Sequence, residues 1–128
     1  MSDPSDPNAW IRYAEEDYQA ARSLLQRRTH LSSSVCFHAQ QCAEKYLKAT
    51  LISKGAEFPK VHDLLLLSGL CEKTGILMGI EAKQLHILSD YAVRARYPGD
   101  EPTPEEAREA VEIAKSVRRF VRKLLGIK

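Results

Sequence analysis

Apolar residues recur at spacings of three and four positions along most of the chain. This spacing places them on one face of a helix, and no stretch alternates as a half-buried strand does. The pattern predicts helices over about residues 8–28, 32–51, 64–73, 80–94 and 104–125. We therefore predict an all-α fold, an antiparallel up-and-down bundle of four long helices with one short helix inserted.

The helix predicted over residues 32–51 organises the chain because it carries two separate stripes. Its apolar stripe includes Val35, Ala39 and Cys42, and a polar stripe with similar spacing consists of His38, Gln41, Lys45 and Lys48. We expect this helix to pack into the bundle and to present a polar edge. His38, Gln41 and Tyr46 suit a contact between two copies of the chain. The alternative for the lysines is a solvated face whose alkyl stems cover the core.

Local signals indicate where the helices begin. Thr103 and Pro104, followed by two glutamates, form the strongest start signal, and either His62 or Asp63 can cap the short helix. Thr29 or Ser32–Ser34 can cap the helix that follows them. Residues 1–7 contain two Asp-Pro pairs and are expected to be a disordered tail, which leaves a single domain over 8–128.

Composition and length exclude several classes of protein. The 128 residues fit one domain, and a net charge of +2 gives no overall attraction to nucleic acid. No apolar run reaches the length of a membrane span, and the first residues do not resemble a signal peptide. Three cysteines without CxxC spacing indicate reduced thiols in a cytoplasmic protein. We expect neither a metal nor a cofactor.

Local charge patterns leave alternatives open. The second half of the last predicted helix is basic, which either complements the helix dipole or forms a nucleic-acid footprint. His86, Asp90 and Arg94 stand four residues apart, so Asp90 either bridges the other two or belongs to an exposed pair. Asp17 interrupts an apolar stripe, and it is either a hydrogen-bonded residue at the bundle edge or part of a functional cleft.

Three stretches together resemble the HEPN domain. They are Trp10 with Ala14, Asp17, Ala20 and Leu24; FHAQQCAEKYLKATL at 37–51 with HDLLLL at 62–67; and Tyr91 followed by Arg96-Tyr97-Pro98. The resemblance covers about residues 9–125. It implies a helical bundle that commonly forms homodimers and is often encoded beside, or fused to, a minimal nucleotidyltransferase.

Some HEPN domains are metal-independent ribonuclease toxins, and these carry an arginine followed after four to six residues by a histidine. No Arg–His pair of this chain has that order and spacing. The resemblance therefore implies a binding module without ribonuclease activity, which binds a nucleotide or docks a nucleotidyltransferase partner in a toxin–antitoxin-like pair. A scaffold that binds no small molecule is a further alternative.

The candidate binding residues combine groups that hold phosphate with aromatic rings that stack on a base. They are His38, Gln41, Lys45, Lys48, His62, Tyr91, Arg94, Arg96 and Tyr97. A structural interpretation also exists, in which Pro98 ends a helix and Arg96 binds the freed carbonyl groups. The alternative function is RNA cleavage through the 2′-hydroxyl, with His62 or His86 as base and Arg94 or Arg96 as cation.

Overall fold

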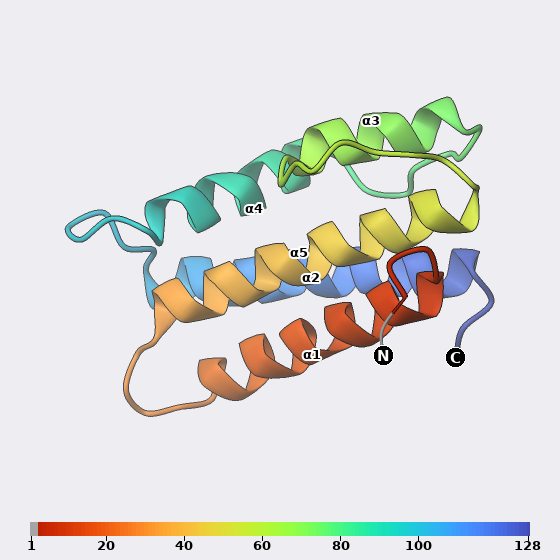
Figure 1. The fold of residues 1–128 in the computed structure, drawn as a ribbon. Helices are drawn as coiled ribbons and strands as arrows, with labels where there is room; N and C mark the ends of the chain where they lie inside the picture. Colours follow the sequence, from red (N-terminus) through yellow and green to blue (C-terminus); the bar gives the residue numbers. More distant parts are fainter. Residues whose placement is uncertain (1–2) are drawn as a thin grey trace.

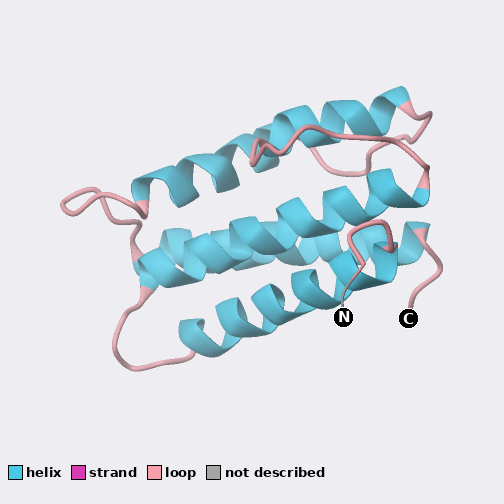
Figure 2. Cartoon of the chain, viewed as in Figure 1, coloured by secondary structure: helices cyan, strands magenta, loops and turns pink. Residues whose placement is uncertain are grey.

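The computed structural model describes residues 3–128 as a helical bundle, with no strand in that range (Figures 1 and 2). The helices are α1 (Pro7–Leu25), α2 (Ser32–Ser53), α3 (Leu64–Lys73), α4 (Ala82–Arg94) and α5 (Pro104–Leu124). The four long helices alternate in direction along the chain, and the short α3 lies in the same layer as α4 (Figure 1). The predicted all-α bundle is confirmed. Within the described range, no helix is long and apolar enough to cross a membrane.

Helix α2 is the centre of the bundle because it contacts every other helix. Its apolar stripe, including Val35, Ala39 and Cys42, is buried. The other helices complete the core with Leu64 and Leu67 of α3, Leu85 and Leu88 of α4, and Val117 and Val121 of α5. All three cysteines are free and buried, as the sequence indicated. Burial raises the pKa of the Cys36 thiol to about 12, so this thiol is unreactive at neutral pH.

Side-chain caps begin two of the helices as predicted. Asp63 caps α3 by accepting hydrogen bonds from the backbone N–H groups of Leu65 (3.0 Å) and Leu66 (3.2 Å). Thr103 and Glu106 form a capping box at the start of α5.

Two helix boundaries and one helix cap differ from the prediction. Helix α1 ends at Leu25 rather than near residue 28, because the next two N–H groups bond to carbonyls three residues back and tighten the last turn. Helix α2 follows Leu31 without a side-chain cap, so the predicted cap from Thr29 or Ser32–Ser34 is wrong. Helix α4 begins at Ala82, because the backbone at Glu81 is extended.

Residues 3–6 form a turn, where the sequence suggested part of a disordered tail. The Asp6 amide bonds to the Asp3 carbonyl at 3.0 Å, and Trp10 Nε1 donates to the Pro4 carbonyl at 2.8 Å. Asp6 then caps α1 by accepting the N–H of Asn8 at 3.0 Å. The rest of the predicted tail, residues 1–2, lies outside the described residues.

Candidate functional site

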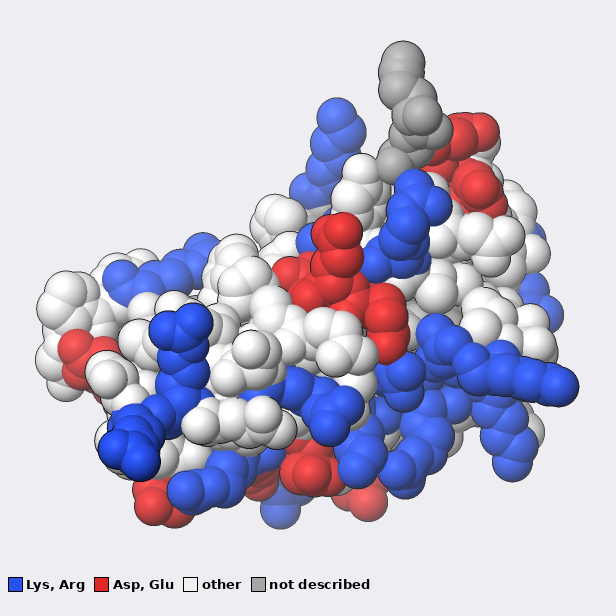
Figure 3. Space-filling view, turned by 90° about the horizontal axis from the view of Figure 1, so that it is seen from below, with Lys and Arg blue, Asp and Glu red and all other residues white. Residues whose placement is uncertain are grey.

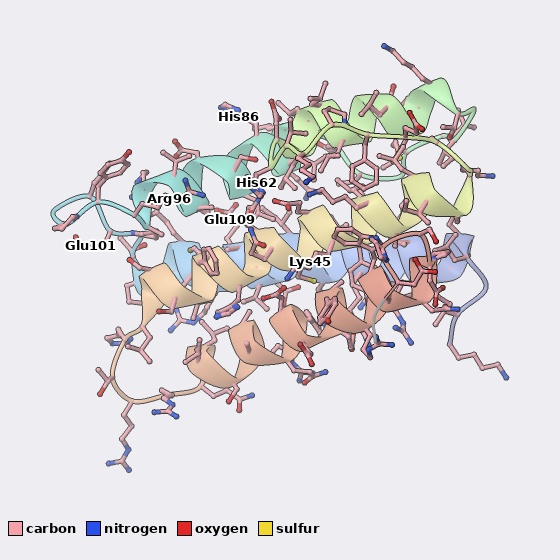
Figure 4. The ribbon with its side chains drawn as sticks, in the orientation of Figure 1. Lys45, His62, His86, Arg96, Glu101 and Glu109 are labelled. Carbon is pink, nitrogen blue, oxygen red and sulfur yellow. The ribbon has the colours of Figure 1, made fainter. Side chains whose placement is uncertain are left out.

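A cleft of about 400 Å³ opens between α2, α4 and the segment that leads into α3. Three of the side chains predicted from the sequence to handle phosphate or protons, His62, His86 and Arg96, line this cleft. The remaining lining residues are Gln40, Asp63, Leu65, Ser89, Ala92 and Val93. Figure 4 shows His62 between α4 and α2, with Arg96 toward the end of α4 and His86 on its outer side. Segments far apart in the sequence thus place two imidazole rings and one guanidinium around the same cleft.

The His62 ring is oriented by a buried carboxylate. Its Nδ1 lies 3.0 Å from both carboxylate oxygens of Glu44, whose side chain is only 3% exposed. A carboxylate accepts hydrogen bonds, so this contact assigns the proton of a neutral ring to Nδ1. The His62 side chain is itself 69% exposed. Its Nε2 is therefore the nitrogen that faces a ligand or solvent.

Glu44 belongs to a polar row along α2, with Gln40 one turn before it and Lys48 one turn after. Gln40 Nε2 donates to Glu44 Oε1 at 3.2 Å and to the His62 carbonyl at 3.0 Å. Lys48 Nζ donates to Glu44 Oε2 at 3.0 Å, and its side chain is only 8% exposed. A buried carboxylate is stable only when its lone pairs are filled in this way. The row fixes both the backbone and the ring of His62.

Lys48 is therefore a buried structural residue rather than part of a solvated face. Its ammonium lies 5.5 Å from the centroid of the Trp10 ring and 5.6 Å from that of Phe58. These rings attract the cation through their negative faces and shield it from water. The expectation that Lys48 lies on an exposed polar edge is wrong, because α1 and the loop after α2 cover it. Its role in ligand binding stays a prediction.

Arg96 and His86 differ from Glu44 in being accessible to solvent. Within residues 3–128, the Arg96 guanidinium has no hydrogen-bond or ion-pair partner, whereas its backbone N–H bonds to the Val93 carbonyl at 3.1 Å. The suggested capping of carbonyls by Arg96 is not observed. Ser89 Oγ, on the preceding turns of α4, is buried without a partner in the same range. Arg96 thus presents an unpaired guanidinium to the cleft within the described residues, while a hydrogen bond holds its backbone.

His38 and Lys45 lie in a different network, between α1 and α2. His38 Nδ1 is 2.8 Å from one carboxylate oxygen of Asp17, and Lys45 Nζ is 2.6 Å from the other. Figure 4 shows Lys45 on the α1 side of α2. Asp17 is thus a buried, hydrogen-bonded residue that ties the two helices together, and it does not line the cleft. The polar stripe of α2 therefore divides between two separate clusters.

Tyr91 and Arg94 point to α5 and bind its glutamates. Arg94 makes two hydrogen bonds of 2.9 Å with Glu106, and the Tyr91 hydroxyl donates to Glu109. The bonds from Arg94 lower the pKa of Glu106 to about 2. The Asp90 carboxylate lies 3.8 Å from Arg94 Nη1, so these two side chains form the ion pair that was one of the two arrangements predicted for Asp90. These contacts join α4 to α5, and a ligand role for Tyr91 and Arg94 stays a prediction.

Gln41, Tyr46 and Tyr97 complete the set of predicted residues. Gln41 Nε2 donates to Gln40 Oε1 at 2.9 Å, so it supports the polar row. Tyr97 is 60% exposed beside Arg96, and its ring is accessible for stacking. Tyr46 is fully buried, so its predicted part in an exposed dimer edge is wrong. Tyr46 follows Cys42 by four residues, so it continues the apolar stripe of α2 into the core.

The sequence reasoning missed Gln40 and Glu44 as functional candidates. Their spacing with Lys48, four residues each time, is the signal that a second polar row exists. Across residues 3–128 there is no group of three or more side chains that could hold a metal ion. The side chains that line the cleft offer imidazole, guanidinium, carboxylate, amide and hydroxyl groups.

Comparison with known proteins agrees with this architecture. The chain is 31% identical to "Putative toxin MJ1304" of Methanocaldococcus jannaschii, over 91% of this chain and 86% of that protein. Its fold is similar to the crystal structure of TT1696 from Thermus thermophilus, with a TM-score of 0.71, 24% identity and coverage of 91% and 96% of the two chains. It is also similar to ST0689, an archaeal HEPN homologue, with a TM-score of 0.69, 24% identity and coverage of 94% and 98%. The family model of the HEPN domain matches residues 7–124, and the chain belongs to the HEPN domain family.

Proposed function

We propose that this HEPN domain is a binding module whose cleft between α2, α3 and α4 holds the phosphate of a nucleotide. The observation that carries the proposal is that His62, His86 and Arg96 line one cleft. Arg96 can grip a phosphate with two parallel hydrogen bonds, and His62 adds a nitrogen held in place by Glu44. Leu65, Val93 and the exposed Tyr97 offer apolar contact to a base.

The rest of the proposal concerns partners. Leu65 and Val93 at the cleft, with Leu66 and Tyr97 beside it in the chain, are exposed apolar side chains. Such a surface suits a second copy of the chain, so we propose a homodimer whose interface covers part of it beside the bound nucleotide. The relative named as a putative toxin supports a role in a toxin–antitoxin-like pair. The proposal of a minimal nucleotidyltransferase as docking partner rests on the family resemblance. A cytoplasmic location stays a prediction.

Calorimetric titration with adenosine monophosphate tests the binding function. The unmodified protein should bind, and His62→Ala should weaken binding at least several-fold because it removes a positioned ring. His30→Ala is the matched control, since His30 is exposed and lies outside this cleft. Equal affinity for the His62 and His30 variants would show that the cleft is not the binding site.

A specific observation also favours the second candidate function, ribonuclease activity. A histidine oriented by a carboxylate, in one cleft with an arginine, can remove the proton from a 2′-hydroxyl while the cation stabilises the phosphorane. We still propose no cleavage, because the arginine-to-histidine spacing of the nuclease members is absent. Incubation with RNA should leave it intact; degradation that is lost in both His62→Ala and His86→Ala but not in His30→Ala would establish the alternative.

A further inference from the structure

The second half of α5 carries more positive charge than its place in the helix explains. Lys115, Arg119 and Lys123 stand four residues apart, on one side of α5. The helix dipole favours cations only within about the last turn. Lys115 lies nine residues before the last helical residue, Leu124, and Arg119 lies five before it. Dipole complementarity therefore accounts for Lys123 and leaves the other two without an explanation.

These three cations are also unpaired. Within residues 3–128, none of them forms an ion pair, although Glu112 precedes Lys115 by only one turn. Arg118 and Arg122 next to them behave differently. Arg118 makes two hydrogen bonds of 2.8 Å with Glu15, and Arg122 Nη1 lies 3.9 Å from the same carboxylate. Glu15 thus neutralises one charge of this row and leaves the others.

The basic surface continues from α5 onto α1. The guanidinium carbons of Arg118 and Arg22 lie 4.7 and 5.6 Å from the centroid of the Tyr18 ring, so both arginines pack on one residue. Figure 3 shows Lys and Arg side chains gathered at the lower right of this face, with a group of Asp and Glu side chains near its centre. The chain as a whole carries a net charge of only +2, so this is a local concentration of charge.

We propose that this surface, formed by Arg22, Lys115, Arg118, Arg119, Arg122 and Lys123, binds the phosphate backbone of RNA independently of sequence. A row of cations in which Lys115, Arg119 and Lys123 have no ion pair within the described residues fits a backbone that presents negative charge at regular intervals. None of its six residues lines the cleft of His62 and Arg96, and Arg118 and Arg122 face α1 rather than α4. The surface is therefore a second binding site, and it does not depend on nucleotide binding in the cleft.

The test is fluorescence anisotropy with a short labelled single-stranded RNA, in salt between about 50 and 200 mM. The variant Lys115→Gln/Arg119→Gln/Lys123→Gln should reduce the slope of log affinity against log salt by about 2, since each phosphate contact to a single strand contributes about 0.7. The control is Arg27→Gln/Arg28→Gln/Lys54→Gln, which removes the same charge from exposed positions elsewhere. The control should keep the slope of the unmodified protein.

Three outcomes would overturn the proposal. The first is no binding by the unmodified protein at the lowest salt. The second is an equal loss of slope in both triple variants, which means that only total charge matters. The third is competition by poly-glutamate as strong as that by unlabelled RNA, which means that the surface prefers an acidic polypeptide. Arg96→Ala in the same assay keeps this inference separate from the proposed function: it should leave the slope unchanged, and loss of RNA binding in this variant alone would place RNA in the cleft.

Discussion

Glu44 and His62 form a hydrogen bond across 18 positions of sequence, with His62 Nδ1 at 3.0 Å from both oxygens of a carboxylate that is almost fully buried. The bond connects the interior of α2 to the wall of the cleft. The Glu44 carboxylate also accepts a hydrogen bond from Lys48, so this one residue binds both a buried ammonium and an exposed imidazole. The stability of the bundle and the geometry of the cleft therefore depend on the same side chain.

Glu44→Gln should destabilise the fold strongly. It leaves the Lys48 ammonium buried without a counter-charge, and the loss of one partner of a buried pair costs about 3–5 kcal/mol. Urea unfolding followed by circular dichroism measures the change in the free energy of unfolding. The double variant Glu44→Leu/Lys48→Met should recover most of this loss, because it removes both charges. A single variant that costs less than about 1 kcal/mol would contradict the burial of this pair.

Stability should fall as the pH drops from about 4.5 toward 2, and Glu15 should contribute to the fall. Burial disfavours its charge, but hydrogen bonds from Arg118 and Tyr46 outweigh burial and lower the pKa of Glu15 from 4.5 to about 2. In this window the unfolded chain takes up a proton that the folded chain does not, so acid favours unfolding. Above pH 4.5 the stabilisation is complete.

Glu15→Gln should make this decline shallower, since glutamine does not titrate. Urea unfolding at several pH values between 2 and 6 measures it. Glu106, whose pKa is also about 2 through its bonds with Arg94, accounts for part of the decline that remains. An unchanged pH profile in the Glu15 variant would mean that its pair with Arg118 does not persist in solution.

The proposed homodimer should depend on the exposed apolar residues at the cleft. Sedimentation equilibrium at tens of micromolar protein should show a dimer, given ordinary interface affinities. Leu65→Glu/Val93→Glu should give a monomer, because it places charges in the contact. Leu77→Glu is the control, since Leu77 is 92% exposed and lies in the loop between α3 and α4. A monomeric unmodified protein would show that the proposed homodimer does not form. Dissociation by Leu77→Glu alone would show that the interface lies elsewhere.

The fold could be predicted from the sequence because helical periodicity and capping are local. A few adjacent residues identified the Thr103-Pro104 start and narrowed the cap of α3 to His62 or Asp63, of which the structure shows Asp63. The absent cap of α2 could not be identified, because Ser32, Ser33 and Ser34 are all suitable caps in isolation, whereas the residue at the cap position is Leu31, whose side chain cannot accept a hydrogen bond.

The site could be predicted only in part. His62 and Arg96 were identified by residue type and by the family resemblance, and the structure brings them to one cleft. The partners of Lys48, Tyr91 and Arg94 depend on contacts between helices, and no local pattern specifies which carboxylate each of them meets. Residue type therefore suggested a larger binding set than the cleft contains.

The free guanidinium of Arg96 provides the most direct test of the cleft. Its backbone is held at the end of α4 and its head group has no partner within the described residues, so it loses little freedom when it grips a phosphate. Arg28 is a matched control, because it is an exposed arginine in the loop between α1 and α2, away from the cleft.

The measurement is calorimetric titration of adenosine monophosphate into Arg96→Ala and Arg28→Ala, with a thermal melt of each variant. Arg96→Ala should weaken binding by about 1.5–3 kcal/mol, the scale of a charged hydrogen bond, and leave the melting temperature nearly unchanged. Arg28→Ala should alter neither. Unchanged affinity with a clear fall in melting temperature for Arg96→Ala would show that Arg96 stabilises the end of α4 and that the cleft does not bind phosphate through it.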